Sequence, residues 1–185
     1  MLANLDSSYL NEVVFAEIIN LATVLVRNRA DSLIQQVAGL IDFCCAIPPL
    51  FVQRSRSYTT ALGPAAAAST SRFFATLVDK KHSRSSDAFL QGLIKHFPAV
   101  LVAYSRAVAD PRGRMRPEVR RELMSGLWPI CDAVTTGGRV QSRGREGEAL
   151  GDAFGLGEGS GGEAEKEIWA DLWSSWARKR YTGQG

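Results

Sequence analysis

The sequence predicts an all-α protein: an antiparallel helical bundle or helical-repeat-like stack of five to six helices. Apolar residues recur at helical spacing through most of the chain, and prolines, glycines and short polar links divide these stretches. No segment alternates apolar and polar residues over the length of an ordinary strand. The 185 residues, 45% of them hydrophobic, suffice for one domain with a core of its own.

Two antiparallel helices are predicted in the first 50 residues. The first covers about residues 7–27, is capped within residues 6–8, and carries apolar residues on two faces. A link at residues 28–30 leads to a second helix, which Asp31 or Ser32 caps and Pro48-Pro49 ends. Because the link is short, the two helices are expected to be antiparallel neighbours.

The middle of the chain predicts a loop, a short helix and a longer one. Residues 53–70 are rich in Ser, Thr, Arg and Ala and indicate a loop, and a short helix is expected over about residues 71–81. A strong apolar face then runs from about Ser86 to Val108. Pro98 lies inside it, and we expect a kink there because proline removes a backbone hydrogen bond.

The last third of the chain predicts two helices separated by a glycine-rich segment. After a basic loop at residues 110–116, Pro117 suits the first position of a helix that Pro129 should kink or end. Ten of the 26 residues in 137–162 are glycine, so this stretch cannot build a core. The predicted organisation is therefore a helical core (residues 1–136), a flexible Gly-rich linker (residues 137–162), and a Trp-rich C-terminal helix packed on the core (residues 163–185).

Charge and cysteine usage favour an intracellular protein. The net charge is +3 and the pI about 8.9, which permits an acidic partner without requiring one. The three cysteines are odd in number and two of them are adjacent, so a disulfide framework is not expected. Residues 1–10 show no signal-peptide pattern, and no uninterrupted apolar run approaches the roughly 18 residues of a membrane span. We therefore expect no membrane contact.

Three sequence patterns resemble sites of chemistry, and none predicts an enzyme. Residues 157–162 match the G-x-G-x-x-G pattern, but no convincing strand precedes them and nearby glutamates would repel phosphate, so a linker is the better interpretation. His82 and His96 lack any zinc-ligand spacing. Cys131 could pair with His96 as a nucleophile, but its apolar helix favours a core residue. We expect no catalytic residue, cofactor, metal or small-molecule substrate.

Two sets of residues are candidates for contacting a partner. Five arginines fall within ten residues, and both an RNA- or protein-binding surface and a solvated face fit them: Arg112, Arg114, Arg116, Arg120 and Arg121. Three tryptophans of the last helix share one broad face, which fits either the core of the bundle or a partner groove: Trp169, Trp173 and Trp176.

The order of several short segments resembles a known family. The segments with the strongest likeness are Pro117-Glu118-Val119-Arg120 and the run Gly126-Leu127-Trp128-Pro129-Ile130-Cys131-Asp132. Before them come Arg72-Phe73-Phe74 and Lys95-His96-Phe97-Pro98, and after them Ile168-Trp169-Ala170-Asp171-Leu172-Trp173. Together they resemble the C-terminal domain of the fungal nucleolar pre-rRNA-processing family of the unhealthy ribosome biogenesis protein 2 type.

The resemblance implies a nucleolar scaffold rather than an enzyme. It implies either a C-terminal piece or a truncated relative of a longer helical protein that acts in early assembly of the large ribosomal subunit (the pre-60S particle). The implied partners are pre-ribosomal assembly factors, with pre-rRNA as a further candidate. No catalytic residue is carried over from the family. The alternative is an intracellular helical protein-binding module unrelated to ribosomes.

Overall fold

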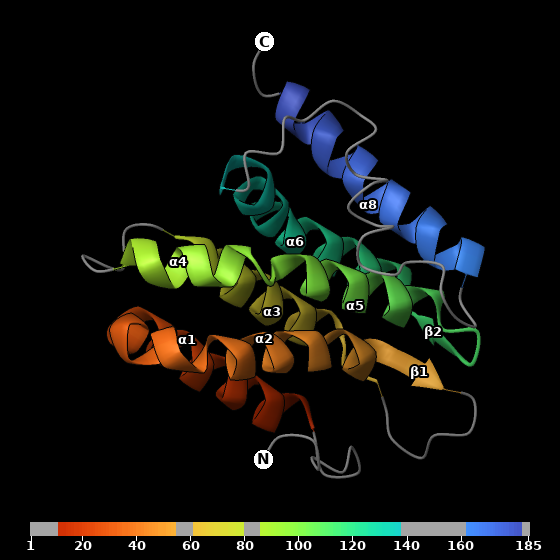
Figure 1. The fold of residues 1–185 in the computed structure, drawn as a ribbon. Helices are drawn as coiled ribbons and strands as arrows, with labels where there is room; N and C mark the ends of the chain where they lie inside the picture. The colour runs from red at the N-terminus through yellow and green to blue at the C-terminus, as the bar shows by residue number, and fades with distance from the viewer. Residues whose placement is uncertain (1–10, 55–60, 80–85, 138–161, 183–185) are drawn as a thin grey trace.

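The computed structural model describes residues 11–54, 61–79, 86–137 and 162–182, and it confirms the all-α fold class (Figure 1). Within these ranges helices dominate and a small two-stranded ribbon accompanies them. Most of the predicted linker, residues 138–161, and His82 lie outside the described residues. The elements are α1 (Glu12–Leu33), η1 (Ile34–Gln36), α2 (Val37–Ala46), η2 (Pro48–Phe51), β1 (Val52–Arg54), α3 (Pro64–Val78), α4 (Ser86–Ile94), α5 (Phe97–Ala109), β2 (Gly113–Met115), α6 (Pro117–Gly137) and α8 (Gly162–Thr182).

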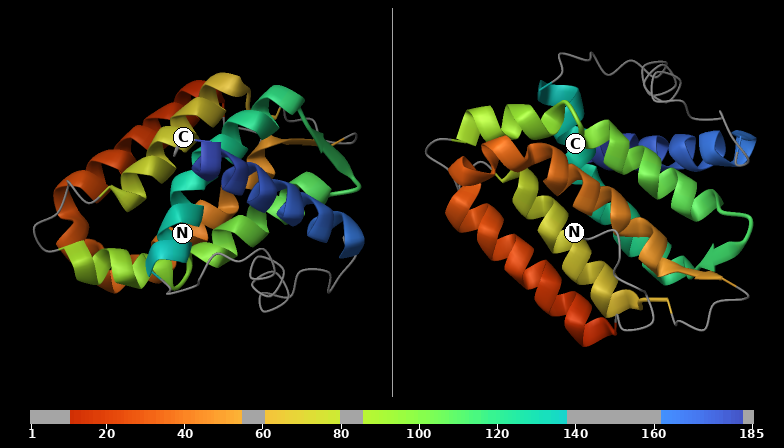
Figure 2. Two further views of the ribbon diagram at one scale, coloured as in Figure 1. Left: turned by 90° about the horizontal axis from the view of Figure 1, so that it is seen from above. Right: turned by 60° about the horizontal axis from the view of Figure 1, so that its bottom comes forward.

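The helices are stacked in layers that run across the molecule. Helix α1 packs on α3 and α4, while α2 packs on α4 and α5. The most extensive contact joins α3 to α6, and α8 covers α5 and α6. Helix α8 therefore lies at the far side of the stack from α1, as the views in Figure 2 show.

The first two helices differ from their predicted bounds. Asn11 caps α1, since its Oδ1 accepts a hydrogen bond of 2.9 Å from the Val14 N–H, and α1 begins at Glu12. The cap predicted within residues 6–8 lies outside the described residues. The predicted link at residues 28–30 coincides with a kink, because Arg29 has non-helical φ and ψ angles of −136° and 28° and joins two helices that together make up α1 (Glu12–Leu33). The chain then turns through the 3-10 segment η1 into α2.

Helix α3 begins at Pro64, well before the predicted residue 71, and this corrects the predicted loop. Gly63 occupies its N-cap and Pro64 its first turn, where a missing N–H costs nothing. The Gly63 N–H donates to Glu12 Oε1 at 2.6 Å, which ties this start to α1. Further along, the Ser71 hydroxyl donates to the Glu122 carbonyl of α6 at 2.9 Å.

Pro98 and Pro129 have different positions in the helices: Pro98 lies at the start of one, and Pro129 lies inside another. The predicted kink at Pro98 is a full break, because α4 ends at Ile94 and Pro98 lies in the first turn of α5. Pro129, in contrast, does not end its helix: α6 continues through it to Gly137.

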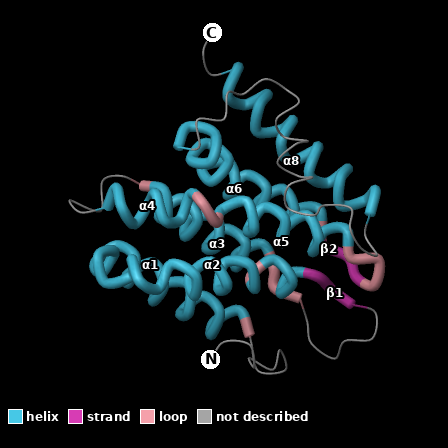
Figure 3. Tube along the Cα trace, viewed as in Figure 1, coloured by secondary structure: helices cyan, strands magenta, loops and turns pink. Residues whose placement is uncertain are grey.

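Two three-residue strands, which were not predicted, pair antiparallel beside the helices (Figure 3). Val52 lies opposite Met115, and Gln53 lies opposite Arg114. They occupy stretches that the sequence indicated as loops. Strands this short leave no alternating pattern long enough to read.

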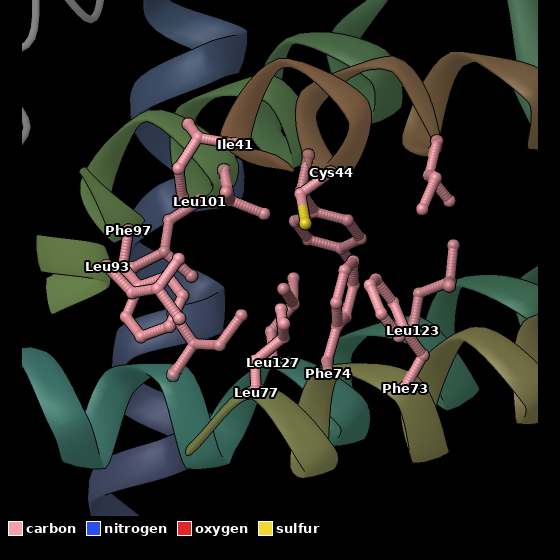
Figure 4. Packing of buried hydrophobic residues seen from close by; sticks show 14 of the residues in the cluster. Ile41, Cys44, Phe73, Phe74, Leu77, Leu93, Phe97, Leu101, Leu123 and Leu127 are labelled. Carbon is pink, nitrogen blue, oxygen red and sulfur yellow. The ribbon is translucent and has the colours of Figure 1, made fainter. Parts of the chain in front are cut away.

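One apolar core joins the layers. Between α2 and the α3–α6 pair, side chains from five helices point toward one another, as Figure 4 shows. Phe73, Phe97 and Leu127 are fully buried there. Phe15 of α1 packs edge-on against Phe51, with ring centroids 5.9 Å apart. This core holds α5 and α6 rigidly, and both candidate sets of residues depend on them.

Among the described residues, Glu12–Phe51 is long and apolar enough to cross a membrane by length and composition. Its mean hydropathy reaches 1.5 over an 18-residue window, of which 28% is buried. The lengths of the uninterrupted apolar runs predicted no such segment. The mean hydropathy over 18 residues is nevertheless high, because the window contains few charged residues. Core helices of folded proteins meet the same criteria, and this stretch bends at Arg29 and turns at η1.

Candidate functional site

A tight turn after α5 presents the basic segment. Asp110 Oδ1 accepts the Arg112 N–H at 2.9 Å, and the Gly113 N–H donates to the Asp110 carbonyl at 3.2 Å. An Asp side chain that bonds the backbone two residues on stabilises such a turn. Residues 113–115 leave it directly as β2, whose pairing with β1 fixes the direction of the segment.

Three arginines of this segment are free of the core. Met115 of β2 is partly buried against the core, so its neighbours Arg114 and Arg116 point to the opposite side of the strand. Arg112 precedes them in the turn, and all three are exposed. We call Arg112, Arg114 and Arg116 the basic strand.

The other two predicted arginines belong to α6, and they differ from each other. Arg121 is exposed. Arg120 forms an ion pair with Asp171 of α8, with 2.8 Å between Nη2 and Oδ2. The Tyr104 hydroxyl donates to the Arg120 carbonyl at 3.3 Å. Burial raises the pKa of Tyr104 to about 12, although the Arg120 guanidinium opposes this shift. Arg120 thus connects α5, α6 and α8.

The tryptophan face of α8 lies mostly inside the protein. Trp169 and Trp176 are 4% and 3% exposed, while Trp173 is partly buried. The Trp169 and Trp173 rings stack with centroids 6.0 Å apart, and the Trp176 centroid lies 4.9 Å from that of Trp173. This face therefore stabilises the docking of α8 on α5 and α6, and only Trp173 leaves part of its ring accessible.

Polar contacts from α6 complete the docking of α8, and no sequence pattern predicted which residues pair. The Trp176 Nε1–H donates to Asp132 Oδ1 at 2.9 Å. Lys179 Nζ lies 4.2 Å from the centroid of the Trp128 ring, a cation–π contact. Asp132 and Trp128 belong to the segment that carries the family resemblance, but partners more than 40 residues apart cannot be read from spacing.

An acidic residue of α8 is buried beside α5. Glu165 is 8% exposed, and its Oε2 lies 3.5 Å from Arg106 Nε. This oxygen accepts no hydrogen bond among the described residues, although it forms the ion pair. The contact is a charge pairing that holds the first turns of α8 against α5.

The described residues offer little chemistry for a reaction. Cys131 and Cys44 are fully buried, and burial raises the pKa of both thiols well above the ordinary range, so neither is a thiolate at neutral pH. His96 is exposed at the start of α5. In the described ranges no three His, Cys, Asp or Glu side chains gather to hold a metal ion. Of the glycine pattern at 157–162, only Gly162 is described, as the first residue of α8.

These features define a helical module that presents surfaces and lacks an evident reaction centre in its described part. The sequence model of the Urb2/Npa2 family matches residues 2–184, nearly the whole chain. The chain belongs to the Urb2/Npa2 family, whose members act in ribosome biogenesis. No curated protein and no solved structure matches it.

Family membership bears directly on the two functions considered from sequence. It confirms the suspected resemblance and a role in ribosome biogenesis, which indicates a nuclear protein. It speaks against a helical module unrelated to ribosomes. The partners within that process, and the roles of the arginines and tryptophans, stay predictions.

Proposed function

We propose that this chain is a non-catalytic scaffold domain that acts in the nucleolus on precursors of the large ribosomal subunit, during pre-rRNA processing. The observation that carries the proposal is the family match over residues 2–184. The buried thiols of Cys44 and Cys131 support the non-catalytic part, because a nucleophile must reach its substrate as a thiolate.

The fold suits a scaffold because its last helix is joined to α6 by contacts between residues far apart in the sequence. Helix α8 closes the stack through Arg120–Asp171 and Trp176–Asp132. A rigid stack keeps its surface groups at fixed separations, which lowers the entropy cost of binding a large partner. The proposed partners are pre-ribosomal assembly factors, and the proposed organisation keeps residues 1–136 as the core that α8 covers.

The basic strand is the part of the surface that best fits RNA. Arg112, Arg114 and Arg116 are exposed within five consecutive residues that span the end of the turn, β2 and the residue after it, while Arg120 is paired with Asp171. Guanidinium groups bind phosphate oxygens in bidentate fashion and release counterions from nucleic acid. Arg121, one turn into α6, adds a fourth exposed charge nearby.

An acidic protein surface is the competing partner for the basic strand. Titration of the full chain with double-stranded and single-stranded RNA, at several salt concentrations, distinguishes RNA from an acidic protein surface as the partner. Replacing Arg112, Arg114 and Arg116 with glutamate should weaken RNA binding and lower the slope of log K against log salt by about 0.7–1 for each lost phosphate contact.

The matched control for each single replacement in the basic strand is Arg27→Glu, which makes the same charge change as Arg114→Glu at an exposed position of α1. It should leave the slope nearly unchanged. If the triple variant and the control behave alike, the basic strand is not an RNA site.

Imaging tests the cellular part of the proposal. Fluorescently tagged chain should accumulate in the nucleolus, together with early large-subunit precursors. Exclusion from the nucleolus would contradict the proposed place of action, whatever the outcome of the RNA titration.

A further inference from the structure

The exposed large hydrophobic side chains of the described residues all lie on α1 and η1. Leu21 is 61% exposed, Val24 50% and Leu25 43%, and Val13, Val14 and Ile34 are exposed as well. Single exposed apolar residues are ordinary, but a contiguous apolar patch on one helix is typical of an interaction surface. The opposite face of α1, with Phe15 and Ile19, is fully buried in the core.

A groove of about 300 Å³ runs between α1 and α2 beside this patch. Ile18, Leu21 and Leu25 line it from α1, and Gly39, Leu40 and Phe43 line it from α2. Ile18, Leu21 and Leu25 follow the i, i+3, i+7 spacing of a helix-packing stripe. Leu40 and Phe43 are three residues apart and lie on one side of α2, with Gly39 beside them. Apolar residues of two helices that face the same groove form a binding surface for an additional helix.

Gly39 gives this groove a notch. A Cβ atom built on Gly39 meets nothing within 4 Å, so open space lies over the backbone of α2 there. The residue is exposed, and its backbone is helical. A large apolar side chain from a bound helix can enter this space without displacing any side chain of the protein.

Opposite charges flank the exposed stripe. Glu17 precedes Leu21 on α1, and Arg29 follows Leu25 at the kink inside α1. Both are exposed, and within the described ranges neither forms an ion pair. A complementary helix therefore carries a basic residue at the end over Glu17 and an acidic residue at the end over Arg29.

We propose that the α1–α2 groove binds one amphipathic α-helix of another protein, laid along α1. Its apolar residues recur at i, i+3/i+4 and i+7, and one large side chain enters the notch at Gly39. Its terminal charges pair with Glu17 and Arg29. This inference does not depend on the proposed function, and the basic strand has no part in it.

The test uses the full chain and fluorescent 18-residue helical peptides with a leucine stripe at this spacing. One peptide has lysine at one end and glutamate at the other; a second has glutamate at both ends. Wild-type chain should bind the first more tightly, by roughly threefold, since exposed ion pairs contribute modestly. Glu17→Lys should reverse this preference, because it makes both ends of the groove basic.

Two variants test the groove itself. Leu21→Glu places a charge in the apolar stripe, and Gly39→Leu fills the notch; each should weaken the first peptide by tenfold or more. The Gly39→Leu variant is expected to fold, because leucine is a better helix former than glycine and has open space at this position. Circular dichroism and the unfolding midpoint check that both variants fold.

Three results would overturn the proposal. The first is failure of either peptide to bind, or binding that neither variant weakens. The second is dimerisation in analytical ultracentrifugation that Leu21→Glu and Gly39→Leu abolish, which assigns the face to a second copy. The third is flotation with phosphatidylcholine–phosphatidylserine vesicles that the same variants abolish, which assigns the face to lipid.

Discussion

Trp176 of α8 donates a hydrogen bond from Nε1 to Asp132 Oδ1 of α6, at 2.9 Å. The two residues are 44 positions apart, and the bond joins the last helix to the segment with the strongest family likeness. Trp176 is 3% exposed, whereas Asp132 is exposed. The bond thus satisfies a buried donor with an acceptor at the protein surface, and it fixes the position of α8.

Asp132→Ala should lower the free energy of unfolding by about 1 kcal/mol, because a buried indole N–H loses its acceptor. Urea denaturation followed by tryptophan fluorescence measures the change. Asp132→Asn is the matched control: its amide oxygen still accepts the bond, so it should lose less than half as much. Equal losses for the two variants would show that charge, and not the hydrogen bond, holds α8.

The ion pair between Arg120 and Asp171 should contribute little on its own. Their side chains are 35% and 43% exposed, and pairs exposed to this degree typically couple by about 0.2–1 kcal/mol. A double-mutant cycle with Arg120→Ala and Asp171→Ala measures the coupling. It should shrink toward zero at about 1 M salt, where screening is strong. A coupling that salt does not change would contradict this account.

Gly126 of α6 permits the close approach of α3. A Cβ atom at this position would lie 2.6 Å from the Ser71 Cα and 2.4 Å from its Oγ, so backbone would have to move. Gly126→Ala should therefore destabilise the protein by about 1–3 kcal/mol, even though alanine is the better helix former.

Gly39→Ala is the control for that prediction, since Gly39 is helical with open space around it. It should raise the free energy of unfolding by up to about 1 kcal/mol. If the two substitutions change stability in the same direction, the contact at Ser71 does not set the α3–α6 distance.

The buried Tyr104 hydroxyl gives the protein a pH dependence in alkali. Its pKa in the folded state is raised to about 12 from an ordinary value of 10, so the folded protein holds this proton more tightly than the unfolded chain. The corresponding stability is present below pH 10 and is lost as the pH rises from 10 to about 12.

Tyr104→Phe isolates this effect because it keeps the ring and removes the titrating group. The difference in unfolding free energy between wild type and Tyr104→Phe should shrink as the pH rises through that window. A difference that stays constant or grows would mean that Tyr104 titrates normally in the folded protein.

The helices that could be predicted are those with large apolar residues at regular spacing. The last helix was placed within a residue or two, because Trp169, Leu172 and Trp176 mark its face and glutamates mark its start. Helix α3 was expected to begin too late, since its first turns are mostly alanine and show no contrast between faces. Strands β1 and β2 were missed because three residues cannot display an alternation.

The division of the arginine cluster could not be predicted. Spacing located five basic residues, but Arg120 is paired by Asp171, which lies 51 positions away. Similarly, the first helix was predicted to carry apolar residues on two faces, and the structure leaves apolar residues exposed at Leu21 and Val24. Which side of an apolar helix stays exposed depends on the other helices of the fold, and no local pattern carries that information.

The most direct test of the account is sedimentation of tagged full-length chain in a gradient of nuclear extract, with large-subunit precursor RNA measured in each fraction. The account predicts that the chain travels with these precursors, and that the Asp132→Asn control does so as well. Chain found entirely in the slow, free protein fractions while precursors sediment normally would contradict the proposed scaffold function.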